Sequence, residues 1–113
     1  MRIAMRRGDI KLVRFLVEDP ERTTTEIDFT EIYFTVKRNT KEKLYMFQKK
    51  LSTGGIVKLG QGDYEVKIEP SDTAAMVYGN YKFDIQLEYL DELKETFVGD
   101  FVLKDEVTFD DNE

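Results

Sequence analysis

The side chains that most often carry out chemistry in proteins are missing or badly spaced in this chain. None of its 113 residues is histidine or cysteine, so it lacks the usual general base near neutral pH and any thiolate ligand for zinc. Asp84 and Glu88 share one face of an expected strand, but at about 3.3 Å per residue they lie roughly 13 Å apart. Glycosidase carboxylates need a separation of roughly 5–9.5 Å. We therefore predict no catalytic residues and interpret these acids as part of a solvated strand face.

Oxygen ligands and glycines suggest no metal or phosphate site either. Five acids near the C-terminus match no calcium loop with its required turn glycine. Gly60-Gln61-Gly62 is too short to cradle a phosphate, and no Lys-Ser or Lys-Thr follows it, so we predict a turn there. We expect no cofactor and no metal. The acids that we interpret as a charged solubilising tail are Asp105, Glu106, Asp110, Asp111 and Glu113.

Basic side chains gather in two parts of the sequence. Those in the second part lie near Tyr45 and Phe47, and a basic patch with aromatics can bind single-stranded nucleic acid. The formal net charge of −6 argues against that partner, so we predict no nucleic-acid binding. We interpret the basic side chains instead as a possible assembly surface. Its members are Arg2, Arg6, Arg7, Lys11, Arg14, Lys49 and Lys50.

The charge is unevenly divided along the chain. Residues 1–58 hold thirteen Lys/Arg against eight Asp/Glu, a net of +5, while residues 59–113 hold four against fifteen, a net of −11. Two explanations stay open. Basic strands can lie beside acidic strands of the same sheet, or a basic face of one copy can meet an acidic face of the next.

Length and composition indicate one folded domain. The chain is 41% hydrophobic and 35% charged, and its eight Phe and six Tyr can supply a core without Trp. We place the domain at residues 1–109 and expect the acidic end, 110–113, to be frayed. No apolar run approaches the roughly 20 residues of a membrane span, and no signal-peptide segment is visible, so we predict no membrane partner. The absence of cysteine fits a cytosolic protein.

Alternating apolar and polar residues predict an all-β fold. Residues 43–51 are ambiguous because Leu44, Phe47 and Leu51 have helical spacing, but strand is preferred between strand neighbours. One-sided alternation with regular turns predicts an antiparallel immunoglobulin-like β-sandwich of about 7–9 short strands, with a barrel as the alternative. The expected strands are residues 2–6, 10–18, 29–38, 43–51, 56–59, 64–69, 81–89, 95–98 and 101–109.

Five residues are predicted to shape the turns between these strands. Pro70 and Asp72 begin a short helical turn near 71–77, which Gly79 can end. Gly62 belongs to a hairpin turn, and Gly99 is expected to make a tight break between two strands.

Several short motifs follow one another along the chain in a fixed order. They are Arg7-Gly8-Asp9, Gly54-Gly55-Ile56, Gly62-Asp63-Tyr64, Pro70-Ser71-Asp72-Thr73, Tyr78-Gly79-Asn80-Tyr81 with Asp84-Ile85, Thr96 with Gly99-Asp100-Phe101, and Val107-Thr108. In this order the chain resembles a small immunoglobulin-like β-sandwich of phage and prophage tail modules, similar to the N-terminal domain of baseplate upper proteins. The stretch Thr23–Phe29 departs from the family, which often has a glycine turn and a Leu-rich strand entry there.

The resemblance implies a structural component of the virion tail or baseplate without enzymatic activity. It would contact other tail proteins or itself as a homo-oligomer, and would occur in the bacterial cytoplasm when expressed from a prophage. The family carries no catalytic residues to transfer. A carbohydrate-binding or adhesion module is the alternative, because tyrosines at a sandwich surface can stack on sugars. The tyrosines considered are Tyr33, Tyr78, Tyr81 and Tyr89.

Overall fold

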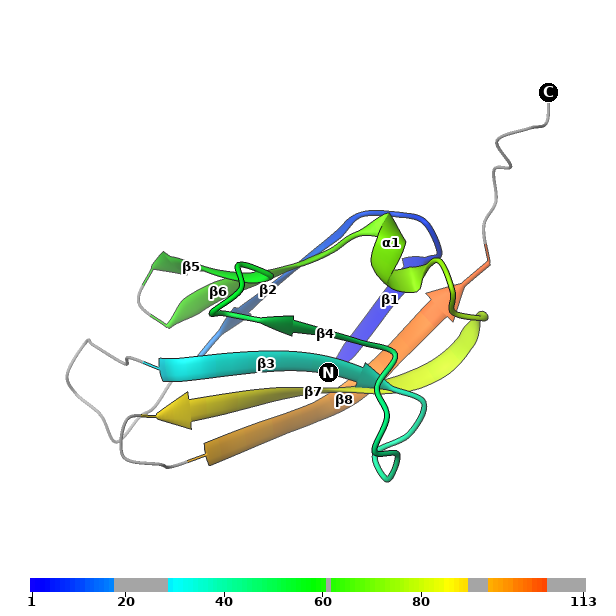
Figure 1. Cartoon of the computed structure of the whole chain (residues 1–113). Coiled ribbons are helices and arrows are strands. Elements are labelled where there is room, and N and C mark those ends of the chain that lie inside the picture. Colours follow the sequence, from blue (N-terminus) through cyan, green and yellow to red (C-terminus); the bar gives the residue numbers. More distant parts are fainter. Residues whose placement is uncertain (18–28, 61, 90–93, 106–113) are drawn as a thin grey trace.

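The computed structural model of the chain describes residues 1–17, 29–60, 62–89 and 94–105 (Figure 1). The side chains of Tyr89, Lys94 and Glu95 lie outside this description. The elements are β1 (Arg2–Arg6), β2 (Lys11–Leu16), β3 (Phe29–Lys37), β4 (Phe47–Lys50), β5 (Ile56–Gly60), β6 (Asp63–Ile68), α1 (Pro70–Thr73), β7 (Gly79–Tyr89) and β8 (Lys94–Lys104).

The strands form two sheets of unequal width. The larger sheet has the order β1-β8-β7-β3-β4, and the smaller has the order β2-β6-β5. The two sheets face each other in Figure 1, with β2, β5 and β6 forming one layer. The three strands β2-β6-β5 and the three strands β3-β7-β8 correspond to the two sheets of an immunoglobulin sandwich. The predicted all-β, immunoglobulin-like sandwich is confirmed, with one departure: β1 pairs with β8 in parallel.

Alternation along each strand produces the core. In β7 the apolar positions Tyr81, Phe83, Ile85 and Leu87 are buried because side chains two apart share a face, and this face meets the smaller sheet. The same period places Ile32, Phe34 and Val36 of β3 inside, and Val13 and Phe15 of β2. These rows are the ones that the alternation predicts.

Aromatic rings of the core form one cluster in each sheet. Phe34 packs on Phe83 with ring centroids 5.4 Å apart, and Phe47 lies 6.2 Å from Phe34 and 6.0 Å from Phe101. The contact between β4 and β8, which are separated by two strands in the sheet, shows that the larger sheet curls inward at its β4 edge. The second cluster stacks Phe15 of β2 on Tyr64 of β6 at 5.7 Å.

The prediction of a strand over residues 43–51 is wrong for its first half. Only Phe47–Lys50 forms a strand, and Leu44 is 79% exposed. The backbone N–H of Lys41 donates to the Asn39 side chain at 3.0 Å, which stabilises a turn. The chain rejoins β3 only where the Met46 N–H donates to the carbonyl of Val36 at 2.7 Å.

Two predicted boundaries are also corrected. β8 runs unbroken through Gly99, so this glycine makes no break between strands. The helical turn occupies only Pro70–Thr73, short of the predicted 71–77. The end of the expected strand 10–18 at residue 18, the end of the expected strand 101–109 at residues 106–109 and the expected frayed end at 110–113 lie outside the described residues.

We expect Phe34→Ala to lower the free energy of unfolding by about 3–5 kcal/mol, because Phe34 is fully buried between Phe47 and Phe83 and its removal leaves a cavity. Urea unfolding followed by circular dichroism measures this change. Val57→Ala is the control, since Val57 is 44% exposed on β5 and should cost far less. Equal losses for the two variants would contradict the assignment of Phe34 to the core.

Candidate functional site

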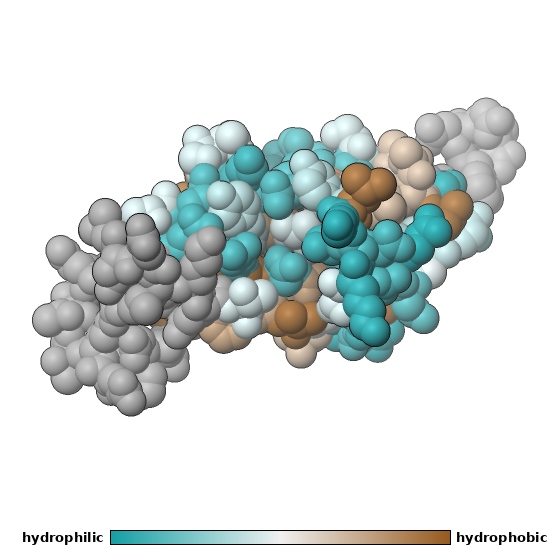
Figure 2. All heavy atoms as spheres, turned by 60° about the horizontal axis from the view of Figure 1, so that its bottom comes forward, coloured by the Kyte–Doolittle hydropathy of each residue, from teal (hydrophilic) through white to brown (hydrophobic). Residues whose placement is uncertain are grey.

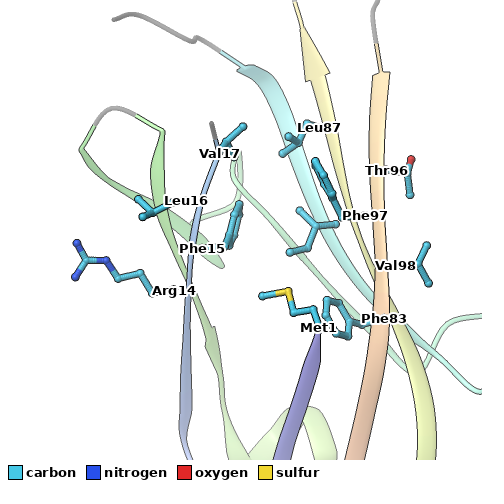
Figure 3. A pocket seen from close by; sticks show the side chains of 11 residues that line it. Met1, Arg14, Phe15, Leu16, Val17, Phe83, Leu87, Thr96, Phe97 and Val98 are labelled. Carbon is cyan, nitrogen blue, oxygen red and sulfur yellow. The ribbon is translucent and has the colours of Figure 1, made fainter. Parts of the chain in front are cut away.

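The main groove of the molecule lies where the two sheets separate, between β2 and β8 (Figure 3). Its volume is about 980 Å³. Phe15 of β2 and Val17, which follows β2, point into it from one side and Phe97 of β8 from the other, while Thr96 and Val98 point away. Its lining is Met1, Arg14, Phe15, Leu16, Val17, Phe83, Ile85, Leu87, Thr96, Phe97 and Val98.

The groove is open because β1 covers only half of β8. The register pairs Arg2 with Asp100 and Arg6 with Lys104, so β1 begins where the second half of β8 begins. Among the described strands, none pairs with the outer side of β8 from Lys94 to Gly99. We call this half-edge of β8, together with the groove between it and β2, the open seam.

Phe97 shows how incomplete the sandwich is at the open seam. It lies opposite Ile85 of β7 on the inner face of the sheet, and Ile85 is 3% exposed. Phe97 is nevertheless 51% exposed, because β1 pairs with β8 only from Asp100 onward and β2 lies across the groove. An inward-facing aromatic side chain with half its surface in water marks a position that a further strand would cover.

Gly99 is the residue that lets β1 begin at this point. A Cβ atom at Gly99 would lie 2.5 Å from the Phe83 ring and 2.7 Å from the carbonyl oxygen of Met1. That carbonyl accepts a hydrogen bond from the Asp100 N–H at 3.1 Å, which closes the β1–β8 ladder. Gly99 is therefore required for close packing against Phe83 and Met1. This packing, and not a break between two strands, explains the glycine at this position.

The structure divides the predicted basic assembly surface between two edges of the sandwich. Arg2 and Arg6 lie on β1, and Lys11 and Arg14 lie on β2, so these four flank the side that contains the open seam. Arg7 follows β1 and lies 5.2 Å from the centroid of the Tyr78 ring. The remaining two, Lys49 and Lys50, lie on β4 at the opposite edge of the larger sheet.

Several of these cations are engaged within the molecule. Arg14 of β2 forms an ion pair with Asp63 of β6, in which its Nε lies 2.9 Å from Oδ1. The Nζ of Lys49 lies 2.7 Å from Asp72 Oδ2, and its side chain is only 13% exposed. Both pairs join the basic first part of the chain to the acidic second part, but only Arg14–Asp63 joins neighbouring strands, as cross-strand pairing predicts, because Asp72 lies in α1. The Arg14 side chain is exposed, so its pair contributes little to stability.

Hydrogen bonds lower the pKa values of Asp63 and Glu31. At Asp63 the hydrogen bond from Arg14 has the largest effect, burial raises the pKa by less, and the charge of Arg14 lowers it further. At Glu31, burial raises the pKa, but hydrogen bonds from the Ser52 side chain and from the N–H groups of Ser52 and Ile32 outweigh it, and the pKa is lowered. Glu31 thereby holds the turn after β4 to β3.

The predicted turn residues have backbone roles. Gly62 has φ +69° and lies so close to Val17 that a Cβ would be 2.7 Å from its carbonyl oxygen. Asp72 accepts a hydrogen bond from the Glu69 N–H at 2.8 Å, so Glu69, before Pro70, occupies the capping position. Gly79 begins β7 directly after the loop that follows α1.

The three tyrosines considered for sugar binding whose side chains are described, Tyr33, Tyr78 and Tyr81, have different surroundings. Tyr81 is 5% exposed and its hydroxyl donates to the carbonyl of Val77 at 2.6 Å. Tyr33 lies on β3 beside the Lys50 ammonium, 5.7 Å from its ring centroid, and Tyr78 lies in the loop before β7. The face in Figure 2 carries mostly hydrophilic side chains with separate apolar patches.

Within the described parts of the chain, no three acidic side chains gather in a group that could hold a metal ion. Nor does any described helix have the length and apolar character needed to cross a membrane. The fold and the site together define an immunoglobulin-like all-β sandwich with one open edge. Comparison with known protein families, curated proteins and solved structures finds no match to this chain.

We expect Asp84→Asn to raise the melting temperature at pH 7 by about 1–3 °C. Burial raises the pKa of Asp84, against a smaller lowering by Lys37. Its folded-state pKa therefore lies above the ordinary 3.8, and the charged carboxylate destabilises the fold at neutral pH. Well below pH 3.8 the Asp84 carboxyl is protonated in both the folded and the unfolded state, so the increase in melting temperature should vanish. Melting curves from pH 3 to 8 measure this, with exposed Asp9→Asn as the control. A gain that persists undiminished at pH 3 would contradict this explanation.

We expect Gly99→Ala to destabilise the fold by about 1–3 kcal/mol and to loosen β1, because the added methyl displaces the Phe83 ring or the Met1 carbonyl. Hydrogen exchange should show faster exchange in residues 2–6. Gly60→Ala is the matched control, since its Cβ would make only an ordinary contact at 3.9 Å with Asp63. Unchanged exchange in β1 with Gly99→Ala would contradict this role.

Proposed function

We propose that the chain is a non-enzymatic structural component of a bacteriophage or prophage tail or baseplate, which acts through protein–protein assembly. The open seam is the observation that carries this proposal. Phe97 faces inward but is half exposed, and no described strand pairs with the outer side of β8 from Lys94 to Gly99. Contact with another protein would cover both.

The tail assignment is supported by the ordered motifs that resemble phage tail sandwiches. Three of these motifs have a defined structural role in the chain. Gly62 allows the close approach of Val17, Asp72 holds the N–H before α1, and Gly99 admits the start of β1. Motifs of this kind maintain the backbone of the sandwich. The residues of the contact surface can then differ between proteins that share the same scaffold.

The partners in this proposal are other tail or baseplate proteins or further copies of the chain. Arg2 is exposed at the end of β1 next to the open seam and can steer an acidic partner toward it, whereas Arg6 and Lys11, also exposed, lie at the far ends of β1 and β2. The proposed location is the virion tail, and the bacterial cytoplasm when the chain is expressed from a prophage. Carbohydrate binding has less support, because Tyr81 is buried and Tyr33 and Tyr78, the other two candidate tyrosines whose side chains are described, lie on β3 and in the loop before β7.

Fractionation of particles tests this proposal. Particles are purified from the phage or bacterium that encodes the chain, tails are separated from heads, and each fraction is analysed by quantitative mass spectrometry. We expect the chain in the tail fraction at a fixed ratio to a known tail-tube protein. An abundant cytosolic protein serves as the control for contamination. Intact tails that lack the chain, with the chain present only in the host lysate, would refute the proposal.

A further inference from the structure

We propose that the open seam binds residues 106–110 of a second copy of this chain as an added β-strand. Val107 and Phe109 of that copy would enter the groove between β2 and β8. The inference rests on the proposed assembly function and names the contact by which copies join.

The backbone of β8 is ready to accept a strand at the open seam. The N–H of Asp100 points toward β1, since it donates to the Met1 carbonyl. Backbone groups two residues apart point to the same side, so those of Val98 and Thr96 also face this edge. Among the described residues, no strand pairs with them there. An extended segment can therefore continue the sheet where β1 stops, which is the mode known as β-augmentation.

The groove beside this edge is suited to apolar side chains. Phe15 of β2 and the following Val17 form one wall and Phe97 of β8 forms the other. Phe83, Ile85 and Leu87 of β7 lie behind them. A strand laid along β8 directs alternate side chains into this groove and the others to solvent. The occupant must therefore alternate between apolar and polar residues.

Only one stretch outside the described residues has this pattern. Residues 18–28 are polar or charged apart from Pro20 and Ile27, and residues 90–93 read Leu-Asp-Glu-Leu between two strands. Residues 106–110 read Glu-Val-Thr-Phe-Asp, with apolar side chains two apart. This is the alternation that the groove requires.

Charge favours the same segment. Its flanking acids are Glu106, Asp110, Asp111 and Glu113. The open seam is bordered by the Met1 ammonium group and by Arg2, whose charges both lower the pKa of Asp100 after the larger effect of Lys82. Arg14, which is exposed, also lines the groove. An acidic segment therefore meets a cationic rim.

The segment must come from another copy. The C-terminal end of β8 lies beside Arg6, at the far end of β1 from the open seam. The distance along β8 from Lys104 back to Val98 is about 20 Å, at about 3.4 Å per residue. Residues 105–109 span at most about 18 Å even when fully extended, and β1 occupies the intervening edge. A chain therefore cannot fill its own seam with Val107 and Phe109.

Donor and acceptor thus lie at opposite ends of β8. Each copy that receives a segment still offers its own segment to the next copy. Such a heterologous contact builds a ring where the rotation closes and a filament where it does not. Both outcomes suit a component that is repeated in a larger assembly.

Light scattering coupled to size-exclusion chromatography tests the contact on the full chain. We expect the wild type to self-associate as its concentration rises. The double variant Val107→Asp/Phe109→Asp should weaken this association at least about a hundredfold, because two apolar side chains no longer enter the groove. The matched control is Thr108→Asp, which adds a charge at the position that faces solvent and should associate nearly as the wild type does.

Val98→Pro tests the acceptor. It removes an N–H that faces the open edge and leaves the hydrogen bonds to β7 in place. Circular dichroism confirms that the variant folds, and Phe97→Lys is the second acceptor variant if it does not. Mixing the donor-defective and acceptor-defective chains should then give a one-to-one heterodimer, since one copy retains the segment and the other retains the seam.

Each outcome decides the inference separately from the proposed function. A wild-type chain that stays monomeric at about 0.5 mM overturns the inference. So does association that the donor variant leaves unchanged, or a mixture that forms no heterodimer. A chain found in tails that fails these tests would keep the tail function and lose the inference. A chain absent from tails that passes them would keep the contact and lose the tail function.

Discussion

The unequal width of the two sheets is the constraint from which the rest of the structure follows. Neighbouring strands lie about 4.8 Å apart, so five strands are roughly 19 Å across and three are roughly 10 Å across. The smaller sheet therefore cannot cover the inner face of the larger one. At one edge β4 curls inward until Phe47 contacts Phe101. At the other edge β1 covers only half of β8, and Phe97 is left half exposed.

Predictions from the sequence succeeded where one local pattern was sufficient. A period of two along β7 identified Tyr81, Phe83, Ile85 and Leu87 as inward, because the pleat alone decides which face a side chain takes. The prediction for residues 43–51 failed because β4 pairs with β3 only from Phe47 onward, and Leu44 remains in solvent. At Gly99 the sequence suggested a turn, whereas the cause is contact with Phe83 and Met1, residues distant in sequence.

The candidate site could not have been predicted from the sequence for the same reason. The open seam exists because Arg2 pairs with Asp100, a register between the two ends of the chain that no local pattern encodes. The basic side chains were visible in the sequence, but their division between the β1–β2 side and the β4 edge was not. The first part of the chain is basic and the second part is acidic, and ion pairs such as Arg14 with Asp63 and Lys49 with Asp72 bring some of these opposite charges together.

The parallel pairing of β1 with β8 has a mechanical consequence. The first and last described strands run in the same direction, so pulling on the two ends draws them past each other lengthwise. The hydrogen bonds of all five register pairs from Arg2 to Arg6 are then loaded in shear at the same time. In an antiparallel terminal pair pulled from one end, the hydrogen bonds would break one after another. Tension along the chain therefore meets its greatest resistance at the strand beside the open seam, and the fold is suited to transmit force.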